Sequence, residues 1–255
     1  MSLVRAKKHL GQHFLKDESI AEQIAFSLSG KNSKVLEIGP GMGILTKYLF
    51  KNSAINEIKV VEIDQESVDY LNQFYPELKG NIFREDFLRM DLDKVFDSPF
   101  AIAGNFPYNI SSQILFKVFE NKDKVPELVG MFQKEVAQRV ASKPGSKVYG
   151  ILSVLLSAYF DIEYLFTVDE HVFNPPPKVK SGVITLRRND VKHLDCDEAF
   201  FVRLVKTAFN QRRKMLRSAL KPLGKSFEDI DPELMTKRAE QLSVEEFIYL
   251  TQKLQ

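Results

Sequence analysis

The chain has 255 residues, of which 44% are hydrophobic and 27% charged, and its formal net charge is +2. This length allows one large domain, or a large one and a small one, with a real hydrophobic core. So small a net charge does not by itself point to nucleic acid, and a single cysteine, Cys196, excludes an internal disulfide framework and suits a reducing cytosol.

The sequence carries no targeting, membrane or metal signal. The basic N-terminus is not followed by the apolar stretch of a signal peptide. The longest apolar run, residues 151–160, is about half as long as a membrane span. The four histidines and Cys196 do not fall at metal-ligand spacings. We therefore expect a cytoplasmic protein that needs no metal and does not enter a membrane.

The first predicted elements are a helix, a strand and a glycine-rich turn. Residues 17–29 show the pattern of an amphipathic helix with Asp17 as its N-cap. Residues 34–38 form a strand pattern that runs into the turn 39–43, and a helical pattern follows. Glycines here let the backbone approach a ligand, or simply serve a tight turn. The spacing is GxGxG, not the GxGxxG of dinucleotide sites, and the lysine of a P-loop is missing, which argues against ATP and GTP.

The second strand pattern, residues 58–63, adds a carboxylate. Glu62 follows Gly39 by 23 residues, and an acidic residue near this distance commonly holds the two hydroxyls of a ribose. Asp64 is a rival for the same role. With the glycine turn upstream, we favour the ribose role of Glu62 over a merely solvated carboxylate.

The third and fourth strand patterns also end in polar residues. The third lies near residues 81–84 and precedes Asp86, which can accept a hydrogen bond from an adenine amine or simply cap a turn. The fourth, residues 99–103, precedes Asn105. Because parallel strands bring their carboxyl ends to one edge of a sheet, this repetition predicts a ligand site there.

The tetrapeptide Asn105-Phe106-Pro107-Tyr108 is the strongest candidate for chemistry. The Asn105 carbonyl oxygen can accept from an exocyclic amine, the Pro107 carbonyl can accept the second amine proton, and Tyr108 can stack on a base. The same residue types are common in turns, so the tetrapeptide alone does not decide.

The strand and helix alternation continues as far as Arg188, with expected strands at 128–132, 160–168 and 180–187 and expected helices at 133–141 and 151–159. Between the last two strands lies a loop with three prolines, 173–179, which cannot be part of a central strand. Phe173 at its start is either a stacking platform for a base or an anchor that faces the core.

After Arg188 the patterns become helical, at 198–210, 212–220, 232–242 and 244–254, with a capping box between Ser243 and Glu246. We therefore expect two domains, residues 1–190 and 191–255. Residues 199–225 hold eight basic residues and no acidic one, a local asymmetry typical of phosphate contacts: Arg203, Lys206, Arg212, Arg213, Lys214, Arg217, Lys221 and Lys225.

Several ordered motifs resemble the bacterial 16S ribosomal RNA adenine dimethyltransferases, from about residue 7 to the C-terminus. They are GQHFL (11–15), LEIGPGMG (36–43), VEID (61–64), NFPYNIS (105–111), QKEVAQR (133–139), YGILSV (149–154), FNPPPKVKS (173–181) and AFNQRRK (208–214). The resemblance implies an α/β fold of the class I S-adenosylmethionine-dependent methyltransferase type, Rossmann-like with helices on both faces of the sheet, plus a small all-α C-terminal domain that binds RNA. It implies that two adjacent adenosines near the 3′ end of small-subunit RNA become N6,N6-dimethyladenosine.

The resemblance also implies roles for individual residues. S-adenosylmethionine would contact His13, Leu15, Gly39, Glu62, Asp86 and Asn105; the catalytic set would be Asn105, Pro107, Tyr108 and Phe173, with Tyr108 and Phe173 enclosing the target base. Two positions depart from the family pattern. His13 stands where Asn is usual, which makes that contact sensitive to pH, and Phe106 stands where Leu is usual, an apolar change that we expect to be tolerated.

The expected partner is 16S ribosomal RNA within the small subunit or its precursor, bound by a monomer. The expected mechanism positions the target amine for in-line attack and needs no strong general base. The alternatives are a 23S RNA adenine methyltransferase of the macrolide-resistance type, which the triple-proline loop and AFNQRRK disfavour, and a non-catalytic RNA-binding assembly factor, which the intact glycines, Glu62 and Asn105 disfavour. A DNA adenine methyltransferase would usually carry Asp in place of Asn105.

Overall fold

The computed structural model describes residues 4–255, and its contacts divide the chain into two compact units. The first unit holds the described residues up to Ala137 together with Glu163–Arg188, and the second holds Gln138–Ile162 and Asn189–Gln255. The sequence predicts a single boundary near residue 190. The division by contacts has a boundary there and also assigns residues 138–162 to the second unit.

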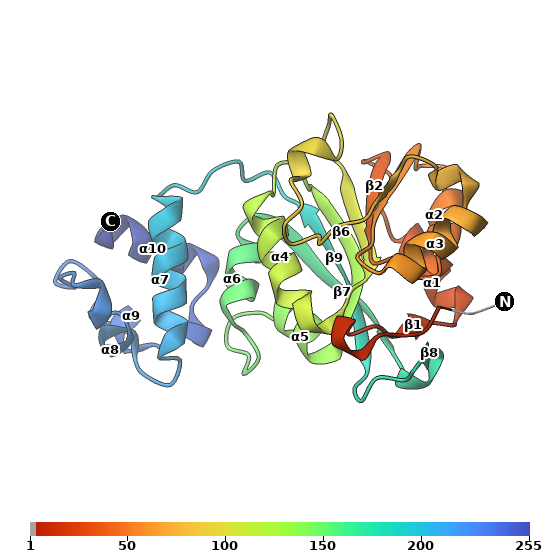
Figure 1. The fold of residues 1–255 in the computed structure, drawn as a ribbon. Helices are drawn as coiled ribbons and strands as arrows, with labels where there is room; N and C mark the ends of the chain where they lie inside the picture. Colours follow the sequence, from red (N-terminus) through yellow and green to blue (C-terminus); the bar gives the residue numbers. More distant parts are fainter. Residues whose placement is uncertain (1–3) are drawn as a thin grey trace. The chain divides into compact units, whose positions relative to one another are not determined.

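The first unit is built on a mostly parallel sheet (Figure 1). From one edge to the other, its strands are β4 (Ile82–Phe83), β3 (Glu57–Val61), β2 (Lys34–Ile38), β5 (Ala101–Asn105), β6 (Glu127–Gln133), β9 (Ser181–Arg188) and β7 (Phe160–Val168). β4, β3, β2, β5 and β6 pair in parallel, and β9 runs antiparallel to β6. The strand order reverses between β2 and β5, and open α/β sheets bind ligands at such a switch point.

The helices of this unit explain why the central strands are so apolar. They are α1 (Glu18–Phe26), α2 (Ile44–Lys51), α3 (Gln65–Phe74), α4 (Ser111–Glu120) and the first half of α5 (Lys134–Val140), which passes into the second unit at Gln138. Four of the five residues of β2 and of β5, and six of the seven of β6, are buried. A parallel sheet covered on both faces needs such continuous apolar runs. Asp17 caps α1 as predicted, with its carboxylate accepting from the Ser19 amide at 2.9 Å.

A second, two-stranded sheet was not predicted from the sequence. β1 (Phe14–Leu15) and β8 (Phe173–Asn174) pair antiparallel, and Leu15 stands opposite Phe173. Figure 1 shows the two short strands side by side. Two residues are too few to produce a periodic signal, so the pairing emerges only from the tertiary structure. It ties the N-terminal segment to the proline loop.

The second unit begins with the end of α5 and contains helices and loops apart from the start of β7. Its helices are α6 (Ile151–Ser157), α7 (Glu198–Asn210), α8 (Leu216–Ala219), α9 (Pro232–Thr236) and α10 (Val244–Leu254). The predicted bounds of α7 and α10 are confirmed, as is the capping box at Ser243, whose hydroxyl accepts from the Glu246 amide at 3.2 Å. The predicted helix 212–220 is wrong in its first half. Met215 is extended and bridges to Arg238, so only Leu216–Ala219 is helical. The predicted helix 232–242 is wrong in its second half, because it ends at Thr236 and Lys237 is extended beside this bridge.

Seven 3₁₀ helices occur in the part of the chain that the structure describes: η1 (Lys8–Leu10), η2 (Pro76–Leu78), η3 (Leu92–Lys94), η4 (Tyr108–Ile110), η5 (Glu170–Val172), η6 (Lys221–Leu223) and η7 (Ala239–Gln241). Within residues 4–255, none of the helices combines the length and apolarity needed to cross a lipid bilayer. The described His, Cys, Asp and Glu side chains form no group of three or more that could hold a metal ion.

Candidate active site

The glycine turn lies at the carboxyl end of β2 and opens onto a cavity. Gly39, Gly41 and Gly43 have φ angles of 66°, 55° and 78°, a left-handed conformation that glycine adopts without strain. A Cβ on Gly43 would lie 2.5 Å from the Tyr75 ring, so this glycine is required by packing. A Cβ on Gly39 would instead lie 3.8 Å from Pro107. Gly39 therefore faces the tetrapeptide 105–108 across the switch point.

Glu62 follows β3 and reaches the same cavity. Its side chain is buried, and its two carboxylate oxygens accept from the backbone amides of Gly41 (3.2 Å) and Asp64 (2.9 Å). Burial raises the pKa of Glu62 despite these hydrogen bonds. Each oxygen keeps a second lone pair, so the carboxylate can still accept from two hydroxyl groups.

The rival carboxylate, Asp64, contacts other side chains of the protein and not the cavity. It forms an ion pair with Lys7 and accepts from Ser67 at 3.1 Å, and it does not line the cavity. Burial alone would raise its pKa, but the hydrogen bonds from Lys7, Gln12 and Ser67 outweigh burial and lower it. The geometry thus favours Glu62 for contact with a ligand.

Asn105, the last residue of β5, is held by the N-terminal segment. Its amide nitrogen donates to the backbone carbonyl of His13 at 3.0 Å. This hydrogen bond fixes the orientation of the amide and leaves the Oδ1 oxygen available as an acceptor. The sequence contains no signal for this contact, because the partner is a backbone carbonyl 92 residues away.

Pro107 and Tyr108 of the tetrapeptide also form hydrogen bonds within the protein. The Pro107 carbonyl accepts from the Ile110 amide and from the Ser111 hydroxyl, both at 3.2 Å. A target amine would therefore share this oxygen with the turn that follows. Tyr108 hydrogen-bonds through its hydroxyl to Ser181, and its ring lies 5.4 Å from the His13 ring between centroids.

Phe106 is accommodated by two glycines. Gly104 on β5 and Gly130 on β6 stand opposite each other, and a Cβ at either position would lie within 3 Å of the Phe106 ring. The ring is buried and packs on Phe132 at 4.7 Å between centroids. These glycines provide the volume that a residue larger than Leu needs at position 106.

Two cavities share a wall at the site. The first, of about 320 Å³, is lined by the glycine turn, Glu62, Asn105 and residues 10–16. The second, of about 580 Å³, is lined by Gln133 and residues 175–179. Gly11, Gln12, His13 and Tyr108 line both. Two ligands, one in each cavity, would therefore come together at His13 and Tyr108, beside Asn105.

Two predicted residues are not brought to these cavities. The Asp86 carboxylate accepts from the Leu88 amide at 2.9 Å, as a turn cap does, and Asp86 lines neither cavity. Phe173 is 1% exposed and packs in the hydrophobic core. It therefore occupies the position of a core-facing anchor, which the sequence left open beside the stacking role. His13 and Leu15 do line the first cavity, and the His13 Nδ1 lies 2.8 Å from the Pro175 carbonyl. The roles of all these residues toward ligands stay predictions.

Comparisons with known proteins extend over the whole chain. A family model described as "Ribosomal RNA adenine dimethylase" matches residues 3–255. The "Ribosomal RNA small subunit methyltransferase A" of Cytophaga hutchinsonii is 57% identical over 256 residues, which cover 100% of this chain and 99% of that protein. The protein of the same name from Parabacteroides distasonis is 59% identical over 98% of this chain and 94% of its own length.

Solved structures show the same architecture. A dimethyladenosine transferase from Plasmodium falciparum matches with a TM-score of 0.76 at 24% identity, covering 93% of this chain and 96% of that one. The 23S rRNA methyltransferase ErmE matches with a TM-score of 0.65 at 26% identity, covering 93% and 99%. These likenesses, with the α/β sheet described above, confirm the predicted class I methyltransferase fold.

Proposed function

This chain belongs to the ribosomal RNA adenine dimethylase family, and we propose that it converts two adjacent adenosines near the 3′ end of small-subunit 16S ribosomal RNA to N6,N6-dimethyladenosine. It is an S-adenosylmethionine-dependent enzyme, and ribosomal RNA is its substrate. The observation that carries the proposal is the meeting of two cavities beside Asn105, whose amide is oriented with Oδ1 free. We expect it to act in the cytoplasm as a monomer during ribosome biogenesis.

The first cavity fits the methyl donor. The Gly39 backbone leaves space toward Pro107 that a side chain would fill, and Glu62 offers two oxygens to ribose hydroxyls. The lining between them is largely apolar, with Leu10, Phe14, Leu15, Ile44 and Ile63 among its residues. When bound, S-adenosylmethionine supplies an already activated methyl group, so the protein needs only to position the acceptor.

The protein must increase the nucleophilicity of the target amine. Its lone pair is delocalised into the adenine ring, which makes the nitrogen a poor nucleophile. We propose that in the first transfer its two protons donate to Asn105 Oδ1 and to the Pro107 carbonyl, which favours a pyramidal nitrogen with the lone pair free. The monomethylated amine has one proton left to donate to these acceptors, and in each transfer the nitrogen releases one proton to water. Tyr108 supports the base by stacking, and an RNA loop end lets the base leave its stack at low cost.

Methyl transfer from labelled S-adenosylmethionine to small ribosomal subunits that lack 3′-end dimethylation tests this function. The products are digested to nucleosides, and large subunits serve as a substrate control. We expect dimethyladenosine on small subunits only. Transfer to large subunits would favour the macrolide-resistance type, and cofactor and subunit binding without transfer would favour an assembly factor.

Asn105→Ala tests the site. We expect the transfer rate to fall at least about a hundredfold, as for the loss of other oriented hydrogen-bonding groups, while the dissociation constant for S-adenosylmethionine rises much less. Asn72→Ala, at an exposed position on α3, is the matched control and should leave both unchanged. Equal loss of cofactor binding and transfer in Asn105→Ala would contradict the assignment.

A further inference from the structure

The N-terminal residues 7–16 lie across the first cavity and are fastened on both sides of it. Residues 10–16 line the cavity. On one side, Lys7 forms an ion pair with Asp64, two residues beyond Glu62. On the other, the Lys16 amide donates to the Val172 carbonyl at 2.8 Å, and β1 pairs with β8. We call residues 7–16 the strap.

The fastening at Lys7 consists of several contacts. Its ammonium group also lies 3.4 Å from Glu66, and its backbone amide donates to the Gln12 side chain at 2.8 Å. The Gln12 amide in turn approaches Asp64 at 3.4 Å. The Asp64 side chain is almost fully buried, and its pKa is lowered, so it is ionised at neutral pH. A buried ionised carboxylate requires its cationic partner, because an unpaired charge away from water is costly.

The middle of the strap is coupled to the catalytic amide. The His13 carbonyl accepts from Asn105, and the His13 ring is held by the Pro175 carbonyl. The carbonyl can orient the Asn105 amide only while the strap is in place. Two of the strap's contacts, one at Asp64 and one at Asn105, therefore join the ribose end of the cavity to the transfer site.

We propose that Lys7 is a positioning residue: its ion pair with Asp64 holds the strap closed over the methyl donor, and closure orients the Asn105 amide through the His13 carbonyl. This rests on the proposed function in one respect, the occupation of the first cavity by the donor. The ion pair slows donor release and, separately, keeps Asn105 Oδ1 directed toward the target amine.

Lys7→Met tests the proposal, with Lys8→Met as its matched control. Lys8 is the next residue, is exposed, and forms no ion pair with any described residue. We expect Lys7→Met to raise the dissociation constant for S-adenosylhomocysteine about fivefold to tenfold, the effect of losing one charge-assisted contact, and to speed amide hydrogen exchange at residues 10–15. Lys8→Met should change neither, and Lys7→Arg should restore both. Identical behaviour of Lys7→Met and Lys8→Met would overturn the proposal.

A second measurement isolates the coupling to Asn105. At saturating S-adenosylmethionine, Lys7→Met should still slow single-turnover transfer several-fold, whereas Lys7→Met added to Asn105→Ala should slow it no further. An unchanged single-turnover rate at saturation would overturn the coupling. The dissociation constant for S-adenosylhomocysteine and the amide hydrogen exchange of residues 10–15 can both be measured without turnover. If the wild-type protein transferred no methyl group, the proposed function would fail, but these two measurements would still test the role of Lys7.

Discussion

At the scale of single residues, Glu37 shows how strongly this fold perturbs a carboxyl group. It lies on β2, is 1% exposed, and accepts a hydrogen bond from the Thr46 hydroxyl at 2.6 Å. Burial raises its pKa to about 8, and the hydrogen bond from Thr46 only partly offsets this. Glu37 is therefore largely protonated in the folded protein at neutral pH.

Replacing Glu37 with Gln should make the stability of the protein less dependent on pH. In the unfolded chain this carboxyl group titrates near 4.5 and in the folded protein near 8, so between these values the folded state binds more protons and the free energy of unfolding falls as pH rises. One pKa unit corresponds to about 1.4 kcal/mol, so the loss reaches a few kcal/mol. Thermal unfolding of Glu37→Gln should match wild type near pH 5 and exceed it above pH 8. Parallel curves for the two proteins, as expected for the exposed-residue control Glu22→Gln, would contradict the raised pKa.

The sequence predicts which residues gather at the site better than it predicts what they contact. Glu62 and Asn105 could be found because each closes a strand, and strand ends converge on one edge. The hydrogen bond between Asn105 and His13 could not, since nothing in either residue type specifies a backbone partner 92 residues away. The choice between Glu62 and Asp64 likewise needed the position of Lys7, which pairs with Asp64.

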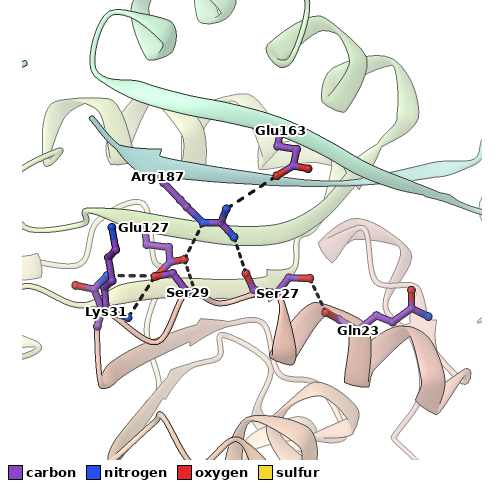
Figure 2. A network of polar contacts seen from close by, with 8 residues as sticks. Gln23, Ser27, Ser29, Lys31, Glu127, Glu163 and Arg187 are labelled. Atoms are coloured by element: carbon purple, nitrogen blue, oxygen red, sulfur yellow. Dashed lines mark hydrogen bonds and ion pairs between the residues drawn. The ribbon is translucent and has the colours of Figure 1, made fainter. Parts of the chain in front are cut away.

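At the scale of elements, a polar network joins the start of β6 to the end of β9 (Figure 2). The buried Glu127 carboxylate accepts from the Ser29 amide and hydroxyl, both at 2.8 Å, and lies 3.5 Å from Arg187. Arg187 also donates to the Ser27 carbonyl at 3.0 Å and lies 3.9 Å from Glu163. The network fastens the segment after α1 to the sheet at the amino ends of its parallel strands, opposite the candidate active site.

Removing Glu127 should therefore destabilise the fold without affecting cofactor binding. Glu127→Ala leaves the Ser29 amide and hydroxyl without their charged partner, whereas the half-exposed Arg187 guanidinium stays in contact with water. Losing hydrogen bonds to a buried charged group costs about 1.5–3 kcal/mol. Glu163→Ala is the control, because Glu163 is 64% exposed and its pair with Arg187 should contribute less than about 1 kcal/mol. Urea unfolding measures both, and the dissociation constant for S-adenosylhomocysteine should stay at the wild-type value. A large loss of affinity in Glu127→Ala would show that the two ends of the parallel strands are coupled.

Long periodic elements were predictable from the sequence, and short or bridged ones were not. β7 and α7 have the bounds that their patterns predict. In α7 the pattern reflects a continuous buried stripe, whereas β7 buries only its two end residues. β1 and β8 have two residues each and depend on one another. The helix expected at 212–220 loses its first half and the one expected at 232–242 loses its second half, because Met215 pairs with Arg238. This tertiary contact overrides local helix propensity.

At the scale of the whole molecule, the basic residues of the segment 199–225 in the second unit differ in their contacts, although the sequence shows them as one uniform run. Arg212 donates to the Lys147 carbonyl, and its Nε lies 3.4 Å from Glu240. Glu240 also accepts, through its backbone carbonyl, from the Gly145 amide at 2.7 Å. Arg212 thus anchors the loop 143–149. Arg213 and Lys214 are exposed, and the described residues provide no carboxylate partner for either.

Neighbouring basic residues should therefore affect RNA binding differently. Each phosphate contact releases counterions, so removing one lowers the slope of log affinity against log salt by about 0.7 to 0.9. We expect Arg213→Met and Lys214→Met each to reduce the slope for small-subunit RNA by this amount while leaving thermal stability unchanged. Arg212→Met should instead lower stability by about 1–2 kcal/mol through the loss of its internal hydrogen bonds, with faster proteolysis of the loop 143–149. Filter binding between 50 and 200 mM salt, with Lys79→Met in the first unit as the control, measures the slopes. If Arg212→Met changed the slope as much as Arg213→Met and left stability intact, Arg212 would be a phosphate contact and not an anchor.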